Sequence, residues 1–297
     1  MKVLITGANG FLGQHLSLFL AERDFQVIAC SRGACRIPLT FPFNYFPIDL
    51  TDETAVNTLL DTAEPHIVIH TAANSKPDDC EINKDDCLMQ NVSVTKFLLS
   101  AALNQPIPPH FIYLSTDFVF GEHGPHNEDD TATPLNFYGK SKLMAEQCVK
   151  ESGLNHTIVR PVFIYGKVWP GLRNDFLHWV KNSLEQQKSI KVVSDQQRTP
   201  TFVNDLCKGI EAIITQNEQG VFHLAGKDLL SPFDMAMQVA SILGLDAALI
   251  ENVTSDSFVE PVIRARRSGL KIDKARKRLH YEPLDFAKAV ELTFNNN

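Results

Sequence analysis

The chain of 297 residues predicts an α/β fold, in which helices cover both faces of a doubly wound parallel sheet and a smaller lobe follows. Three observations predict this fold. Short apolar runs alternate with helical patterns up to about residue 166. The first run ends in a glycine-rich turn that opens a helix. The run at residues 66–70 has the apolar centre of a strand that is buried on both faces.

The first strand and its turn are the most informative stretch. Residues 2–5 form an apolar strand pattern, residues 6–13 read Thr-Gly-Ala-Asn-Gly-Phe-Leu-Gly, and residues 11–22 form a helix pattern. This order predicts a Rossmann-type dinucleotide site with the phosphates at the helix N-terminus. A glycine-rich turn without a ligand is the less favoured alternative. The residues expected at the cofactor in this turn are Gly7, Asn9, Gly10, Phe11, Leu12 and Gly13.

The second strand, at residues 25–30, ends in Ser31 and Arg32, with Arg36 shortly after. Sites for NAD usually carry an acidic residue here, which binds the ribose 2′-hydroxyl. A hydroxyl and a fixed cation suit a 2′-phosphate instead. The sequence therefore favours NADP(H), with NAD(H) as the alternative, and places Ser31 and Arg32 at the cofactor. Arg32 could also be a solvated loop cation.

The next two strands end in residues that suit the rest of a dinucleotide. A strand at residues 44–48 leads into Asp49 and Leu50, where the carboxylate could accept a hydrogen bond from an adenine amino group. Capping of the helix that reaches about residue 63 is the rival explanation for Asp49. The strand at residues 66–70 leads into Ala72 and Ala73, whose small side chains would let the backbone lie along the cofactor.

Candidate catalytic residues follow the fifth strand, at residues 111–115. Thr116 stands at its carboxyl end, where open α/β sheets bind ligands. A helix over residues 136–152 then carries Tyr138 and Lys142, four apart and on one face. A lysine about 4 Å away would lower the tyrosine pKa by up to about three units. Tyr138, with a hydroxyl of Thr116 or Ser115, could then polarise a carbonyl and protonate it as a general acid during hydride transfer.

With these residues in place, the sequence resembles the extended short-chain dehydrogenases/reductases, nearest the dTDP-4-dehydrorhamnose reductase group. That group includes the similar regulatory beta subunit of methionine adenosyltransferase. The resemblance covers the chain nearly end to end. The matching stretches are residues 6–13, 70–73, 91–92, 115–120, 134–142 with Glu146, 160–166, 198–201 and 203–206.

The resemblance implies reduction of the 4-keto group of a nucleotide-linked deoxysugar. It implies that Thr116, Tyr138 and Lys142 carry out catalysis. It also implies that Asp117 helps to organise the substrate sugar. It also implies that Pro161 to Phe163 line the nicotinamide carboxamide. The residues that it places at the cofactor beyond the first turn include Ser115, Asn91, Pro161 and Phe163.

Asn91 lies inside a helical pattern at residues 84–104, where Asn is locally unfavourable. In the resembling superfamily an Asn at this place holds a water-linked proton path to the lysine; a polar residue facing solvent is the alternative. Phe118 stands where the family usually has Tyr, so a hydroxyl near the substrate is lost. Arg264 and Arg267, with Arg266 between them, are candidates for the substrate diphosphate, and a solvated basic face is the alternative.

The rest of the sequence sets boundaries. Residues 1–166, with part of 190–225, are expected to form the cofactor domain, and residues 167–297 mainly a substrate-binding lobe. A net charge of −7 disfavours nucleic-acid binding, and no apolar run is long enough for a membrane span. Six scattered cysteines without a paired motif, and a strand that begins at residue 2, favour a reduced cytoplasmic protein without a metal site. A homodimer is compatible with the sequence.

Two other functions stay open. One is a sugar-nucleotide epimerase that uses NAD transiently; a dehydratase is disfavoured because Asp117 is followed by Phe118 and not by Glu. The other is a regulatory subunit that keeps the nucleotide site without turnover.

Overall fold

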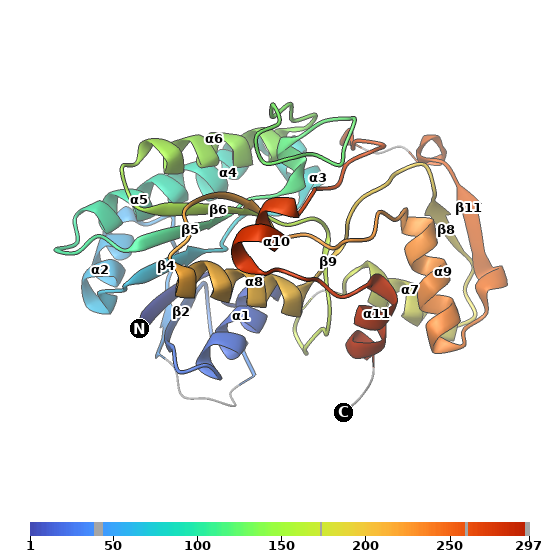
Figure 1. Cartoon of the computed structure of the whole chain (residues 1–297), viewed down its shortest axis with the longest axis horizontal. Helices are drawn as coiled ribbons and strands as arrows, with labels where there is room; N and C mark the ends of the chain where they lie inside the picture. The colour runs from blue at the N-terminus through green and yellow to red at the C-terminus, as the bar shows by residue number, and fades with distance from the viewer. Residues whose placement is uncertain (39–43, 173, 259–260, 295–297) are drawn as a thin grey trace.

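The computed structural model describes residues 1–38, 44–172, 174–258 and 261–294, and it places a large sheet with its helices beside a smaller lobe (Figure 1). The sheet has seven parallel strands in the order β10-β6-β5-β4-β1-β2-β3. The predicted doubly wound α/β fold is confirmed. The strands of this sheet are β1 (Lys2–Thr6), β2 (Gln26–Ser31), β3 (Asn44–Pro47), β4 (Ile67–His70), β5 (His110–Leu114), β6 (His156–Arg160) and β10 (Gly220–His223).

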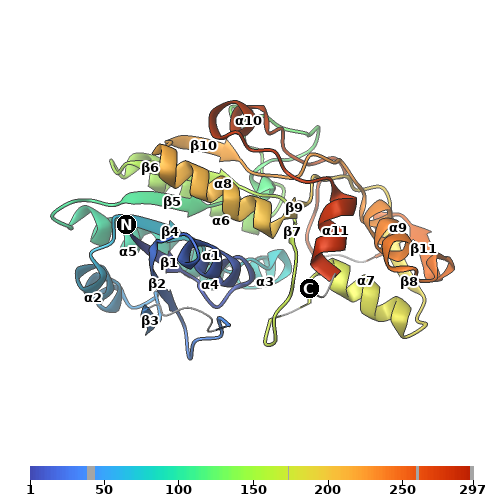
Figure 2. The same ribbon diagram turned by 60° about the horizontal axis from the view of Figure 1, so that its bottom comes forward.

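Helices cover both faces of the sheet because neighbouring strand residues alternate between two cores. Val3 and Ile5 of β1 belong to the core under α1 and α8, whereas Leu4 belongs to the core under α2, α5 and α6. Figure 2 shows α8 beside α1. The bounds of these helices are α1 (Phe11–Ala21), α2 (Glu53–Ala63), α5 (Val94–Leu103), α6 (Phe137–Glu151) and α8 (Val203–Gln216).

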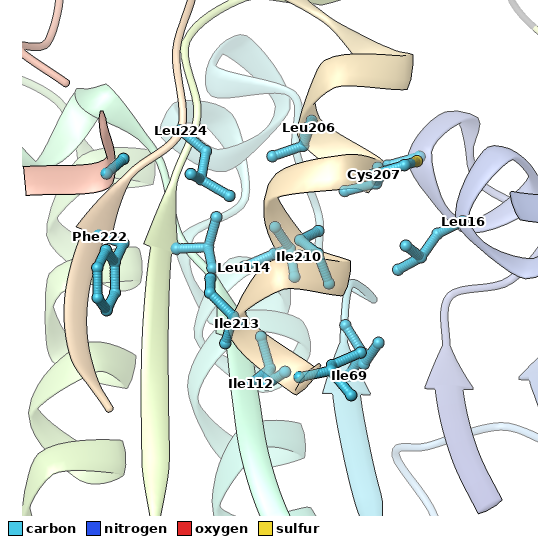
Figure 3. Packing of buried hydrophobic residues seen from close by; sticks show 14 of the residues in the cluster. Leu16, Ile69, Ile112, Leu114, Leu206, Cys207, Ile210, Ile213, Phe222 and Leu224 are labelled. Carbon is cyan, nitrogen blue, oxygen red and sulfur yellow. The ribbon is translucent and has the colours of Figure 1, made fainter. Parts of the chain in front are cut away.

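The helix α8 returns the chain from the second lobe to the main sheet. Its apolar residues Leu206, Ile210 and Ile213 point toward Ile112 and Leu114 of β5 (Figure 3). Burial of each such aliphatic side chain stabilises the fold by about 1.5–3 kcal/mol relative to leaving it exposed. Strand β10 then adds the last strand beside β6. Segments from the start of the chain and segments beyond residue 200 thus share one apolar core.

The single helix predicted over residues 84–104 is interrupted in the structure, and another short helix precedes it. A short α3 (Pro77–Ile82) and α4 (Lys84–Leu88) meet at Asn83, whose side chain caps α4. A π-helical turn (Met89–Ser93) then joins α4 to α5. Such turns are rare and occur often at functional sites.

The smaller lobe has its own apolar core, which includes Tyr165, Leu177 and Met235. Its strands β8 and β11 pair in parallel, and β7 pairs with β9 where the chain passes between the lobes. Ser231 and Asp234 form a capping box at the start of one of its helices. The remaining elements are β7 (Ile164–Tyr165), α7 (Phe176–Glu185), β8 (Ile190–Val193), β9 (Thr201–Phe202), α9 (Pro232–Leu243), β11 (Ile250–Val253), α10 (Asp273–Leu279) and α11 (Phe286–Phe294), with short 3₁₀ turns at Asp117–Val119, Ala247–Leu249 and Ser255–Ser257.

Among the described residues, none of the helices has the length and apolar character needed to cross a membrane, and no group of three or more potential ligands could hold a metal ion.

Candidate active site

A cavity of about 760 Å³ lies along the carboxyl ends of the strands of the main sheet. Segments that follow β1, β2, β3, β4, β5 and β6 all line it, as the switch-point rule for open α/β sheets predicts. Nearly all the predicted site residues meet there. They are Gly7, Asn9, Gly10, Phe11, Leu12, Gly13, Ser31, Arg32, Asp49, Leu50, Ala72, Ala73, Ser115, Thr116, Asp117, Phe118, Tyr138, Lys142, Pro161, Phe163 and Arg264.

The glycine turn is packed too tightly for side chains. Gly7 has a φ of 69°, and a Cβ added there would lie 2.7 Å from the backbone of Ala72. A Cβ at Gly13 would lie 2.3 Å from the carbonyl oxygen of Gly7. The helix α1 follows Gly10, which supplies no side-chain cap for the first N–H groups. This cradle has the form and the donors that a pyrophosphate needs.

Asn9 shapes the cavity through the loop after β2. Its amide nitrogen donates to the carbonyl oxygens of Arg32 (3.2 Å) and Ala34 (2.9 Å), and its Oδ1 accepts from the backbone N–H of Arg36 (2.8 Å). Both arginines line the cavity. The Asn9 side chain therefore holds in place the loop that carries the two cations.

Asp49 does not cap the following helix. Its Oδ1 accepts hydrogen bonds from the backbone N–H and the hydroxyl of Thr51, at 3.0 and 2.9 Å. The backbone bond from Thr51 is the main cause that lowers the pKa of the Asp49 carboxyl. Asp52 is the N-cap of α2. Of the two explanations offered for Asp49, capping is thus excluded.

Tyr138 and Lys142 both line the cavity, but their electrostatics differ from the prediction. Burial raises the pKa of Tyr138 well above its ordinary value, and a hydrogen bond with Thr116 opposes this only in part. Lys142 donates to the Leu114 carbonyl oxygen at 2.6 Å and lies 4.2 Å from the ring centre of Tyr113. Burial lowers the pKa of Lys142 to about 7. The expected lowering of the Tyr138 pKa by Lys142 is therefore wrong, because burial is the larger effect.

Asn91 lies behind the cavity wall, in the π-helical turn, and is 1% exposed. Its Oδ1 accepts from the backbone N–H of Asn74 at 2.8 Å, and its Nδ2 donates to the Ser141 hydroxyl at 2.9 Å. The alternative of a polar residue facing solvent is wrong. The structure instead makes Asn91 a clamp between the loop after β4 and the helix α6.

Behind Ser115 lies a buried ion pair that sequence reasoning left without a role. The Ser115 hydroxyl donates to Glu146 at 2.5 Å, and Arg160 binds both carboxylate oxygens of Glu146, at 2.8 and 2.6 Å. The Ser115 hydroxyl is held there by a short bond to the carboxylate of an ion pair, whereas the Thr116 hydroxyl makes a longer bond of 3.2 Å to Asp117, so Thr116 is the better candidate for contact with a substrate. Glu146 also acts against the lowering of the Lys142 pKa.

The part of the cavity beyond Tyr138 is lined from both lobes. Asp117 accepts hydrogen bonds from the hydroxyls of Thr116 and Ser268, each at 3.2 Å. Burial raises the pKa of Asp117, and the charge of Arg198 opposes this. Arg198, which lines the cavity, was missed; the only signal was its place in a stretch that matched the resembling family.

The three C-terminal arginines have different positions. Arg264 lines the cavity and pairs with Asp78 of α3 at 3.0 Å. Arg266 and Arg267 are exposed, and neither is among the residues that line the cavity. The structure therefore does not bring Arg267 to the predicted substrate site.

The fold and the site together define the class: an extended short-chain dehydrogenase/reductase. The profile of the family described as RmlD substrate binding domain matches residues 1–297, and the chain belongs to this family.

Proteins with similar sequences include a probable reductase and a subunit of a methionine adenosyltransferase. The chain is 30% identical over 284 residues to a probable low-salt glycan biosynthesis reductase of Haloferax volcanii, covering 94% of this chain and 92% of the relative. It is also 30% identical over 273 residues to methionine adenosyltransferase 2 subunit beta of Rattus norvegicus, covering 90% and 78%.

Among solved structures, a dTDP-4-dehydrorhamnose reductase from Bacillus anthracis, in complex with NADP, has a TM-score of 0.87 at 28% identity and covers 99% and 98% of the two chains. A UDP-glucuronic acid 4-epimerase from Bacillus cereus, in complex with UDP-glucuronic acid and NAD, has a TM-score of 0.84 at 25% identity, again covering 99% and 98%.

Proposed function

We propose that this chain is an NADP(H)-dependent reductase of a nucleotide-diphospho-4-keto-6-deoxysugar, with Tyr138 as general acid. The observation that carries the proposal is that Thr116, Tyr138 and Lys142 line one cavity with the glycine cradle and the loop of Arg32. The solved reductase with NADP and the glycan biosynthesis reductase support the same activity.

The residues of the cavity fit a dinucleotide. Gly7 and Gly13 leave room where side chains would collide, and the start of α1 offers N–H groups. Ala72 and Ala73 offer a backbone with small side chains. When bound, the nicotinamide would supply the hydride. The protein's own side chains would transfer the proton and stabilise the charge that develops on the substrate oxygen.

Tyr138 is suited to give a proton. Because burial keeps its pKa high, the hydroxyl stays protonated at neutral pH until a more basic oxygen develops on the substrate. Thr116 offers a second hydroxyl that can hydrogen-bond the same oxygen and stabilise its negative charge. Lys142, whose ammonium is held by the Leu114 carbonyl, would place positive charge beside this pair.

Turnover tests this proposal directly. NADPH consumption would be followed after adding dTDP-4-dehydrorhamnose to the purified protein and to Tyr138→Phe. We expect turnover by the wild type and a loss of about 10²-fold or more in the variant, because the proton donor is removed. Phe137→Leu, at the neighbouring position, is the control and should keep most of the activity. Binding of NADPH without turnover of any 4-keto sugar would contradict the proposal.

The preference for NADP(H) depends on the loop after β2. Arg32→Ala should weaken NADPH binding by about tenfold or more, since a charge-assisted hydrogen bond contributes about 1.5–3 kcal/mol. NADH binding should change by less than about twofold. The measurement is fluorescence titration of both cofactors, with Arg23→Ala, in the turn after α1, as control. An equal loss for NADPH and NADH would show that Arg32 does not read the 2′-phosphate.

The similarity to methionine adenosyltransferase 2 subunit beta favours a second candidate, a regulatory subunit. In that case the chain would bind NADPH, lack turnover, and co-purify with a methionine adenosyltransferase catalytic subunit. Size-exclusion chromatography of the two purified chains together distinguishes this candidate from the reductase.

A further inference from the structure

Two cysteines lie directly behind the candidate catalytic tyrosine. Cys80 on α3 and Cys87 on α4 belong to one small buried cluster with Tyr138, against which Phe118 and Phe137 pack. Neither thiol lines the cavity, but Ser75 and Pro77, just before Cys80, do. The pair is therefore one layer away from the site, on two helices that meet at Asn83.

The two thiols are hydrogen-bond partners, and their surroundings make them unequal. The bond between them raises the pKa of Cys80 and lowers that of Cys87. Cys87 has two more partners: it donates to the Ser141 hydroxyl at 3.3 Å, and the Asn91 amide nitrogen lies 3.5 Å from its sulfur. A thiolate at Cys87 would thus be stabilised by two donors, the Cys80 thiol and the Asn91 amide.

The other cysteines of the chain lack this arrangement. Burial raises the pKa of the Cys30 thiol to about 12 and also raises that of Cys207. Within the part of the chain that the structure describes, neither the Cys30 thiol nor the Cys207 thiol makes a hydrogen bond. Cys35 and Cys148 are partly exposed. These four cysteines can therefore serve as internal controls for the reactivity of Cys80 and Cys87.

We propose that Cys80 and Cys87 form a reversible disulfide that acts as a peroxide-sensitive modification site behind Tyr138. The thiolate of Cys87 attacks hydrogen peroxide, the O–O bond breaks, and a sulfenic acid forms on Cys87 with release of hydroxide. The thiol of Cys80 then attacks that sulfur and expels the second oxygen as water. Two thiols and one peroxide thus yield one disulfide and two waters.

Access for a small oxidant is provided by the local structure. The helices α3 and α4 contain 6 and 5 residues, and Ile82 at the end of α3 is 78% exposed. Short helices with few buried residues open locally at low cost. Because the two thiols are already hydrogen-bond partners within one buried cluster, their sulfurs lie near each other before oxidation.

Oxidation would act on the tyrosine through Ser141. The Ser141 hydroxyl donates to the carbonyl oxygen of Tyr138 at 2.7 Å and accepts from Cys87. A disulfide removes the Cys87 proton and draws α3 and α4 together against the first turn of α6. The glycine cradle lies on a different element. We therefore expect lower turnover with unchanged cofactor affinity.

The first experiment reads the bond itself and does not depend on the proposed reductase activity. The native full-length protein is treated with hydrogen peroxide, free thiols are alkylated under denaturing conditions, and peptides are analysed by mass spectrometry. A Cys80–Cys87 link that dithiothreitol reverses is expected, with Cys30 and Cys207 still reduced. A pair that stays fully alkylatable while Cys35 or Cys148 is oxidised would overturn the proposal.

The second experiment connects the bond to the site. Peroxide should lower wild-type turnover at least fivefold, reversibly, and leave the NADPH dissociation constant within twofold. Cys80→Ser and Cys87→Ser should each resist the treatment, whereas Cys148→Ser should respond like the wild type. A link that forms without any change in turnover would refute the effect on Tyr138. A chain without turnover before treatment would contradict the reductase function, and the mass-spectrometric result would still decide the modification site.

Discussion

At the scale of single residues, burial decides the protonation of the candidate catalytic pair, Tyr138 and Lys142. Tyr138 and Lys142 have the spacing of a tyrosine activated by lysine, but both side chains are buried. Desolvation disfavours the charged form of each, so the pKa of Tyr138 is raised and that of Lys142 is lowered. The site is thus prepared to hold a protonated tyrosine, which suits reduction of a carbonyl.

The Lys142 pKa makes stability depend on pH. Its value of about 7 in the folded protein lies below the ordinary 10.5, so between these limits the unfolded chain binds one more proton. The contribution of Lys142 to the free energy of unfolding should therefore rise with pH from about 7 upward, by up to about 1.4 kcal/mol per pH unit. The measurement is urea unfolding of the wild type and Lys142→Met at pH 7, 8 and 9.

The difference in stability between wild type and Lys142→Met should shift in favour of the wild type as pH rises. Lys140→Met, at an exposed position on the same helix, should show no such trend. Parallel pH curves for the wild type and Lys142→Met would mean that Lys142 keeps its ordinary pKa.

At the scale of elements, two glycines where the first turn meets α1 have different effects. One affects the stability of the fold, and the other affects the binding of the cofactor. A Cβ at Gly13 would meet the Gly7 oxygen at 2.3 Å and the Ala8 Cα at 2.7 Å, both backbone atoms. A Cβ at Gly10 would meet only the Gly7 oxygen, at 3.0 Å. The two glycines therefore have different duties: one lets the helix lie against the turn, and the other keeps the cavity open.

Gly13→Ala should lower the free energy of unfolding by about 1–3 kcal/mol or more, because a rigid backbone contact must be relieved. Gly10→Ala should cost less stability but should weaken NADPH binding by at least tenfold, since its methyl group would stand where the phosphates approach. Urea unfolding and cofactor titration of both variants test this split. Equal stability of the two variants would contradict the assignment.

At the scale of the whole molecule, the substrate side of the cavity forms only where the two lobes meet. Asp117 follows β5 and is hydrogen-bonded to Ser268, which lies 151 positions further along the chain. Arg264 reaches from the same C-terminal segment to Asp78, with side-chain exposures of 19% and 48%. The C-terminal segment therefore completes the wall opposite the sheet.

Arg264→Gln should raise the KM for the nucleotide sugar by about tenfold or more and leave the NADPH dissociation constant within twofold. The reason is that Arg264 lies at the substrate side of the cavity, where a diphosphate would lose a charged partner. Arg266→Gln, two residues away and exposed, is the matched control and should change neither value. Steady-state kinetics with both variants provides the measurement, and equal effects at the two positions would assign Arg264 to a general basic surface.

The sequence by itself determined the sheet, the glycine cradle and the three candidate catalytic residues. These depend on short-range signals: glycine spacing, alternation of apolar runs, and a tyrosine and lysine four residues apart on one helix. Strand ends in a parallel sheet must then meet at one edge, so residues such as Thr116 and Ala72 could be expected at the cavity that they line without knowledge of packing.

Only the tertiary structure decided what the surroundings do to these residues. The packing of α3 and α4 on α6 buries Tyr138, the π-helical turn makes Asn91 a clamp, and the approach of the C-terminal segment selects Arg264 over Arg267. Desolvation and contacts between distant segments depend on three-dimensional neighbours, and no local pattern in the chain encodes them. The cysteine pair behind Tyr138 is of the same kind, since the unequal pKa values of its two thiols come mainly from their hydrogen bond with each other and from burial.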